Sequence, residues 1–186
     1  MKQTMLLITC AALLASCDKG PQVDLKNATG NQVAKAVTQS GAVPSTSFIE
    51  PGEWQLTTKI EQMEMPGLSP EDEARMKQMT ATDSADTANH CVTPPEAKKP
   101  MTNFSGTQKS CTYDHYTMGA GQIDIAMVCQ QPGETQTSHI VGTYTPTTLS
   151  ADIESRTTAG RHAGGIMKSH IDYQRIGECT GKDDDE

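Results

Sequence analysis

Apolar and polar residues alternate along the segment GEWQLTTKIEQMEM, which covers residues 52–65. Trp54, Leu56 and Ile60 fall on one face, while polar residues such as Lys59 fall on the other. A period of two is typical of a β-strand with one buried face. The pattern therefore predicts a half-buried strand near the start of a folded domain.

A short helix is predicted directly after this strand. Pro66-Gly67 ends the alternation, and the segment Ser69-Pro70-Glu71-Asp72 follows. Serine is a favoured N-cap, proline suits the first helical position, and acidic residues suit the first turn. We expect a surface helix that ends near Met79, followed by a loop over residues 80–89.

The rest of the chain is predicted to be mainly β. Six further strands are expected, over residues 90–93, 104–117, 122–131, 135–144, 149–157 and 166–177. Short turns rich in Gly, Pro and Thr join them, and no β-α-β spacing occurs. We therefore predict a domain over residues 48–180, an antiparallel meander that curls into a barrel or half-barrel.

The first residues, MKQTMLLITCAALLASC, have the pattern of an export signal. Their apolar run of about ten residues is too short to span a bilayer. Leu14-Ala15-Ser16-Cys17 resembles the bacterial lipobox, which predicts a signal peptide over residues 1–16 and a lipidated Cys17. The alternative is an ordinary secretory signal that contains a chance cysteine.

Acyl chains such as palmitate on Cys17 would anchor the mature chain to a membrane. Residues 17–47 hold no aromatic residue and are interpreted as a flexible tether. Such a tether spans on the order of 30 Å. Asp18 after the lipidated cysteine slightly favours the periplasmic side of the inner membrane, and residues 181–186 are expected to form a disordered acidic tail.

Composition excludes some classes of function. The formal net charge is −8, and basic residues do not cluster with aromatic residues, so nucleic-acid binding is not expected. The chain holds one Trp, four Tyr and two Phe. A core with so few aromatic residues is expected to need support from disulfides in an oxidising compartment.

Four cysteines besides Cys17 belong to the predicted domain, and the hairpin between two strands suggests how they pair. The segment CTYDHYTMGAGQIDIAMVC is symmetric about Ala120, which places Cys111 opposite Cys129. Cys91 and Cys179 then form the second disulfide. The same register pairs Tyr113 with Met127, His115 with Ile125, and Thr117 with Ile123.

No metal site or catalytic motif is expected. The histidines, His90, His115, His139, His162 and His170, form no HExxH motif and no close pair. The cysteine spacing fits no zinc site. Methionine fills irregular cores more often than it binds copper. The motif GxSxG is absent, so an enzyme is not expected and no cofactor is predicted.

Several segments together resemble a known family. They are Pro51-Gly52-Glu53-Trp54, Met65-Pro66-Gly67, His90-Cys91-Val92-Thr93-Pro94, Gly142-Thr143-Tyr144 and Arg175-Ile176-Gly177-Glu178-Cys179. This pattern is similar to the domain of unknown function family 3617, which consists of small exported bacterial proteins. The resemblance implies export and a disulfide framework, and it carries no activity or catalytic residue to transfer.

The function expected from these features is a non-enzymatic, membrane-anchored periplasmic binding module for a small apolar ligand or a protein partner. Candidate ligand-facing residues are Trp54, Ile60, Ile125 and Val141. One alternative is a structural or envelope-stress interaction protein that uses strand edges and no pocket. Another is a metal-handling protein that uses Met and His side chains.

Overall fold

The computed structural model describes residues 22–40, 49–81, 86–97 and 110–180. The predicted signal peptide over 1–16, the lipidation site Cys17 and the acidic tail over 181–186 lie outside the described residues. So does the first part of the strand predicted over 104–117. Within the described residues, no helix has the length and apolar character needed to cross a bilayer.

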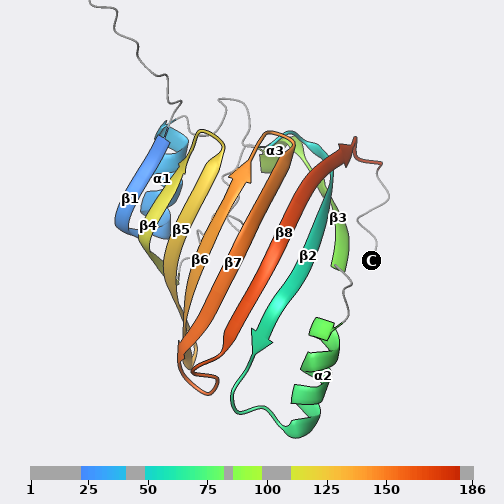
Figure 1. Cartoon of the computed structure of the whole chain (residues 1–186). Helices are drawn as coiled ribbons and strands as arrows, with labels where there is room; N and C mark the ends of the chain where they lie inside the picture. Colours follow the sequence, from blue (N-terminus) through green and yellow to red (C-terminus); the bar gives the residue numbers. More distant parts are fainter. Residues whose placement is uncertain (1–21, 41–48, 82–85, 98–109, 181–186) are drawn as a thin grey trace, which may run out of the picture.

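The chain folds as an eight-stranded antiparallel sheet with strand order β1-β4-β5-β6-β7-β8-β2-β3 (Figure 1). The strands are β1 Gln22–Thr29, β2 Gly52–Glu64, β3 Asp86–Val92, β4 Cys111–Gly119, β5 Gln122–Gln131, β6 Glu134–Tyr144, β7 Thr148–Ala159 and β8 Ile166–Gly177. The helices are α1 Gly30–Ser40, α2 Pro70–Ala81 and α3 Pro94–Ala97. The prediction of a mainly β antiparallel fold is confirmed. The sheet stays open, which corresponds to the half-barrel form of that prediction.

The two faces of the sheet differ in character. The inner face carries the core, in which Trp54, Tyr113, Tyr116, Ile125 and Leu149 are almost completely buried. The outer face is polar. This contrast follows from the alternation of side chains along most strands of the meander.

Helix α2 begins as predicted. The Ser69 hydroxyl accepts a hydrogen bond from the Asp72 backbone N–H at 3.2 Å, which is the geometry of an N-cap. The acidic first turn, which includes Glu71, is exposed. Helix α2 contacts β2 and continues to Ala81, two residues beyond the expected end (Figure 1).

The predicted tether over residues 17–47 is corrected where the structure describes it. Residues 22–29 form the edge strand β1, and residues 30–40 form α1, whose Val33 and Val37 are fully buried. Thr29 and Gln32 form a reciprocal cap, because Gln32 Oε1 accepts the Thr29 backbone N–H at 2.8 Å. The polar composition of this segment led to the wrong prediction, because the tertiary packing of a few valines stabilises its strand and helix.

The loop predicted over residues 80–89 is also wrong in part. Residues 86–92 form β3, an edge strand that pairs with β2. The side chains of residues 87–90 are all exposed. Because neither face is buried over residues 87–90, this part of β3 shows no alternation of apolar and polar residues, and periodicity could not reveal it.

Both predicted disulfides are present. Cys111–Cys129 crosses the β4–β5 pair with a Cα–Cα distance of 4.0 Å, and Cys91–Cys179 has a Cα–Cα distance of 5.5 Å. The second bridge links edge strand β3 to the chain just after β8. The two bridges therefore cross-link different sides of the sheet, one in the β4–β5 hairpin and one near the β3 edge.

The register of the β4–β5 hairpin matches the prediction for Tyr113 and Met127 but is wrong beyond them. His115 pairs with Ala126, and Thr117 pairs with Asp124, because a bulge intervenes between Tyr113 and His115. The hairpin closes through a two-residue turn, Ala120-Gly121, with φ of 49° and 76°. A loop centred on Ala120 alone would have had an odd number of residues. The bulge adds one residue to β4, which allows the two-residue turn. It also shifts the register by one residue, so His115 faces outward.

Candidate functional site

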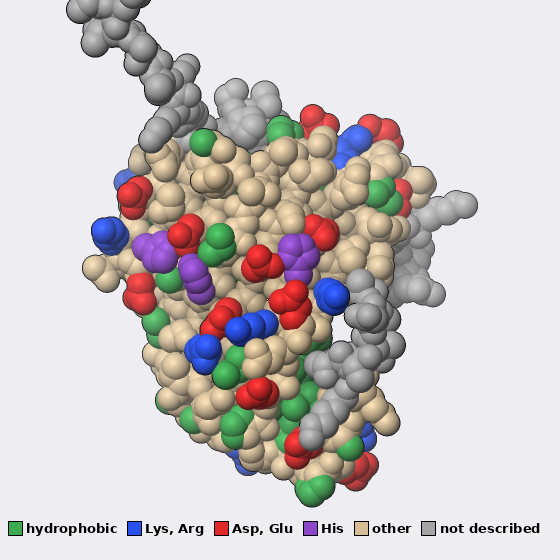
Figure 2. Space-filling view, viewed as in Figure 1, with side chains coloured by type: hydrophobic (Ala, Val, Ile, Leu, Met, Phe, Trp, Pro, Cys, Tyr) green, Lys and Arg blue, Asp and Glu red, His purple; other side chains and the backbone are tan. Residues whose placement is uncertain are grey.

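The outer face of the sheet carries histidine and carboxylate side chains close together near its middle (Figure 2). They project from five consecutive strands, β4 to β8. Each strand contributes one or two ionisable side chains at positions whose neighbours point into the core. Alternation along the strands, together with the bulge that turns His115 outward, therefore gathers these groups on one face.

Three of these residues form what we call the His–Asp cluster: His115, Asp124 and His139. The Nε2 atoms of His115 and His139 lie 2.8 and 2.9 Å from the same Asp124 oxygen, Oδ1. The two imidazole rings meet edge to face, with centroids 5.9 Å apart. All three side chains are partly open to solvent, with exposed fractions of 34%, 51% and 53%.

Strand pairing explains why the cluster forms. Ala126 in β5 pairs with His115 of β4 on one side and with His139 of β6 on the other. The small Ala126 side chain leaves space between the two rings. Asp124 lies two residues along β5 on the same face, within reach of both rings.

The histidines perturb the acidity of Asp124. Its pKa is lowered, mainly by the hydrogen bond from His115 and also by the hydrogen bond from His139, while partial burial acts in the opposite direction. The carboxylate is therefore held in its charged form. A negative charge between two imidazole nitrogens is an arrangement that can accept a cation.

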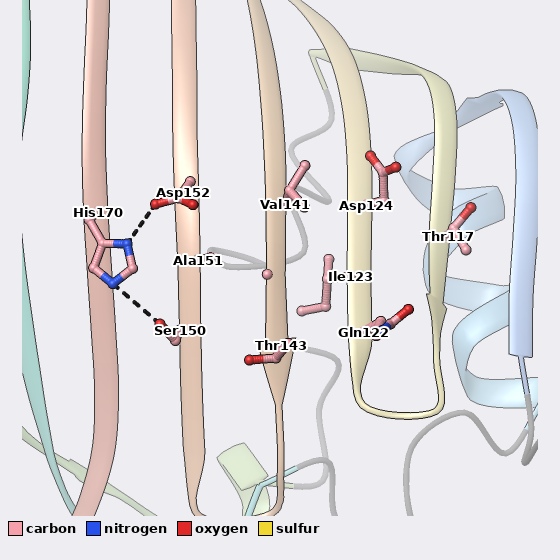
Figure 3. Close-up of a pocket in the computed structure, with 11 residues that line it drawn as sticks. Thr117, Gln122, Ile123, Asp124, Val141, Thr143, Ser150, Ala151, Asp152 and His170 are labelled. Carbon is pink, nitrogen blue, oxygen red and sulfur yellow. Dashed lines mark hydrogen bonds and ion pairs between the residues drawn. The ribbon is translucent and has the colours of Figure 1, made fainter.

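A hollow of about 530 Å³ adjoins the cluster on the same face (Figure 3). Its lining is contributed by Thr117, Gln122, Ile123, Asp124, Val141, Gly142, Thr143, Ser150, Ala151, Asp152 and His170. Asp124 belongs both to the hollow and to the His–Asp cluster. The lining offers hydroxyl, amide and carboxylate groups that can hydrogen-bond a polar ligand.

His170 holds a second hydrogen-bonded group at the edge of the hollow (Figure 3). Its Nδ1 lies 2.6 Å from Asp152 Oδ1, and its Nε2 lies 3.3 Å from Ser150 Oγ. Asp172 Oδ2 lies 3.4 Å from the same Nε2. The pKa of His170 is raised, first by the hydrogen bond to Asp152 and then by the nearby charges of Asp172 and Asp152.

The four ligand-facing residues expected from the sequence do not lie together. Trp54 and Ile125 are 0% exposed in the core, and Ile60 is partly exposed on the inner face. Val141 is 45% exposed and lines the hollow on the outer face. The structure therefore does not bring these four side chains to one cavity.

Sequence reasoning missed the polar residues of the outer face. A signal was present, because Asp124, His139, Asp152 and His170 each occupy an outward position in successive predicted strands. Aligning those strands as a meander would have placed Asp152 opposite His170, as the structure does. His115 could not be placed this way, since the bulge shifts it by one residue.

Comparison with known proteins gives one match. Residues 49–179 match the family described as "Protein of unknown function (DUF3617)". Comparisons with curated proteins and with solved structures find no match. The matched region includes β2 to β8 and both disulfides, and it excludes β1 and α1.

Proposed function

Because this chain belongs to the DUF3617 family, whose function is unknown, we propose a function from its geometry. The protein is a non-enzymatic binding module of the bacterial cell envelope, anchored to the membrane through Cys17. It binds a polar, cationic group of a small ligand or of a protein partner in the hollow on its outer face. No cofactor is needed for this role.

The observation that carries the proposal is the contrast between the two faces. The inner face packs Trp54 and Ile125 as fully buried core residues, so these two side chains are not open to an apolar ligand. The outer face has a hollow of about 530 Å³, a size typical of small-ligand sites. Binding is therefore better supported on the outer face.

The charges that line the hollow indicate the chemistry of the ligand. Asp124 and Asp152 contribute carboxylates, and Thr117, Thr143 and Ser150 contribute hydroxyl groups. These groups accept hydrogen bonds from an ammonium or guanidinium group. His170 bonds Asp152 on one side of the hollow, and His115 and His139 bond Asp124 Oδ1 on the other, so a cationic group would meet a carboxylate on each side.

The location in the cell envelope rests on two independent features. The lipobox-like segment that ends at Cys17 supports export and lipid anchoring, and Asp18 slightly favours the inner membrane. The disulfides Cys91–Cys179 and Cys111–Cys129 are typical of an oxidising compartment. Both features agree with a periplasmic domain.

A hydrolase is a second candidate, because Ser150, His170 and Asp152 have the connectivity of a catalytic triad. The setting argues against it. Ser150 lies in the internal strand β7, where the ladders to β6 and β8 use the backbone amides that an oxyanion would need. Turnover of an activated ester that is lost in Ser150→Ala would favour the hydrolase.

Binding through strand edges is a third candidate. The sheet is open, and β1 and β3 form its two edges. An unpaired edge can accept a strand from another protein. The outer-face hollow is favoured, because it combines a concave shape with converging polar groups.

Site-specific photo-crosslinking in cells tests the proposal. A benzophenone side chain placed at Val141, at the hollow, is expected to crosslink the ligand or partner. The control position is Ile176, which has nearly the same exposed fraction, 47% against 45%, and lies further along β8. From His170 to Ile176 the strand extends about 20 Å.

The crosslink at Val141 should weaken when Asp124→Asn removes the charge. Equal crosslinking from Val141 and Ile176, or a Val141 product that Asp124→Asn leaves unchanged, would argue against the hollow as the binding site.

A further inference from the structure

We propose that the His–Asp cluster is a binding site for a divalent first-row transition ion such as Zn²⁺. His115 and His139 would each supply Nε2, and Asp124 would supply a carboxylate oxygen. This inference goes beyond the proposed function, since it requires neither the lipid anchor nor an organic ligand. The chain also offers a clean comparison, because it has other histidines that lie outside the cluster.

The donor atoms already lie close to the separations that a bound ion requires. Donors that bind one ion at about 2.1 Å lie roughly 3.0–3.4 Å apart at octahedral or tetrahedral angles. Both Nε2 atoms are 2.8–2.9 Å from Asp124 Oδ1, and all three ligand atoms lie within 4.8 Å of one another. To bind one ion, the two nitrogen–oxygen distances must open by a few tenths of an ångström, and the two Nε2 atoms must come to about 3.0–3.4 Å from each other by rotation of the rings.

Binding replaces hydrogen bonds with metal–ligand bonds. Each imidazole that donates its Nε2–H to Asp124 must move that proton to Nδ1 or release it to solvent, so that the Nε2 lone pair faces the ion. The carboxylate stays charged throughout. Two neutral imidazoles and one carboxylate give a site of charge −1, and a divalent ion makes it +1.

The backbone holds the three ligands in place. They project from β4, β5 and β6, which are neighbouring strands of one sheet, with a single bulge in the β4–β5 ladder just before His115. Ala126 lies between the two rings and cannot block the ion. Since strand positions vary little, the ordering cost of binding falls on three side chains alone.

Neighbouring charges leave the site accessible to a cation. Glu154 lies opposite His139 on β7, but it already pairs with Arg156 and Lys168. Lys26 lies opposite His115 on β1. Among the described residues that pair with the cluster, Lys26 is a cation, so the attraction for a metal ion comes from the Asp124 carboxylate that both imidazoles hydrogen-bond.

The donor types select the class of ion. Imidazole nitrogen with a single carboxylate suits Zn²⁺, Cu²⁺ or Ni²⁺, whereas Ca²⁺ and Mg²⁺ prefer sites built from oxygen ligands. Three protein ligands leave coordination positions open on the solvent side. Asp124 also lines the hollow, so a bound ion and the cationic group of the proposed ligand would compete for this carboxylate.

Zinc titration of the full chain tests the proposal. The protein is extracted in detergent, purified without a polyhistidine tag and stripped of metal, and Zn²⁺ alone is added in a calorimeter. We expect one high-affinity Zn²⁺ per chain. His115→Ala, His139→Ala and Asp124→Asn should each weaken this binding by at least about tenfold.

His90→Ala is the matched control, because His90 is an exposed strand histidine on β3, away from the cluster. It should bind Zn²⁺ as the unchanged chain does. Circular dichroism of every variant checks that the sheet is retained, and X-ray absorption of the zinc-loaded chain should show two imidazole ligands.

The proposal is overturned if the unchanged chain binds no Zn²⁺ at micromolar concentration. It is also overturned if His115→Ala and His139→Ala, both folded, bind as tightly as His90→Ala does. Crosslinking at Val141 in metal-free protein is a separate readout, so failure of the metal site and failure of the outer-face binding proposal can be told apart.

Discussion

Replacement of Trp54 by alanine tests whether this residue belongs to the core or to a ligand cavity. Trp54 is 0% exposed, and its ring stacks on Tyr173 with centroids 4.9 Å apart. Its Nε1–H donates a hydrogen bond to the Glu50 carbonyl at 2.9 Å. Both the ring and the Nε1–H group of Trp54 therefore make contacts within the folded core.

The loss in the free energy of unfolding that Trp54→Ala causes can be estimated from these contacts. An aromatic side chain that buries about 200 Å² contributes roughly 5 kcal/mol at about 25 cal/mol per Å². The ring stack and the Nε1 hydrogen bond each add about 1 kcal/mol. Partial relaxation around the Trp54→Ala cavity reduces the total, so we expect a loss of about 3–5 kcal/mol in the free energy of unfolding.

Urea denaturation followed by circular dichroism measures this loss without relying on tryptophan fluorescence. Val141→Ala is the control, since its side chain is 45% exposed and should change stability by no more than about 0.5 kcal/mol. If Trp54→Ala costs no more than Val141→Ala, Trp54 does not pack as core, and the argument against an apolar cavity fails.

Three further predictions concern the turn, the second disulfide and pH. Ala120→Asn should raise the free energy of unfolding by about 1 kcal/mol in urea titrations, because Ala120 has a φ of 49° that asparagine tolerates better. Replacing Cys91 and Cys179 by alanine should cost about 4 kcal/mol, measured under oxidising conditions, because the bridge spans 88 residues. The pKa of His170 is raised, so its contribution to stability is complete below the unfolded value of 6.5 and is lost as pH rises through the folded value. Urea midpoints should fall over this range, and Asp152→Asn should flatten the fall.

The sequence predicted the meander well because its strands are amphipathic. Residues 122–131 and 166–177 were expected as strands and are β5 and β8 with those bounds. The disulfide Cys111–Cys129 followed from the approximate symmetry of a single hairpin. In such segments, local pattern and tertiary structure agree, so the pattern is sufficient.

Two features could not be predicted, for separate physical reasons. The segment 22–40 has low hydrophobicity and is stabilised by contacts with the distant strand β4. The bulge after Tyr113 depends on how the Ala120-Gly121 turn closes. A shift of one residue decides which face His115 occupies. The hydrophobic pattern alone therefore could not predict that His115 joins the His–Asp cluster.

We propose that an exported, lipid-anchored chain presents this domain outside the cytosol. Intact-mass spectrometry of the protein extracted from bacterial membranes tests it most directly. The account predicts a chain that begins at Cys17, carries a diacylglyceryl group and has two disulfides. A chain that retains residues 1–16, lacks lipid and holds Cys91, Cys111, Cys129 and Cys179 as free thiols would contradict it.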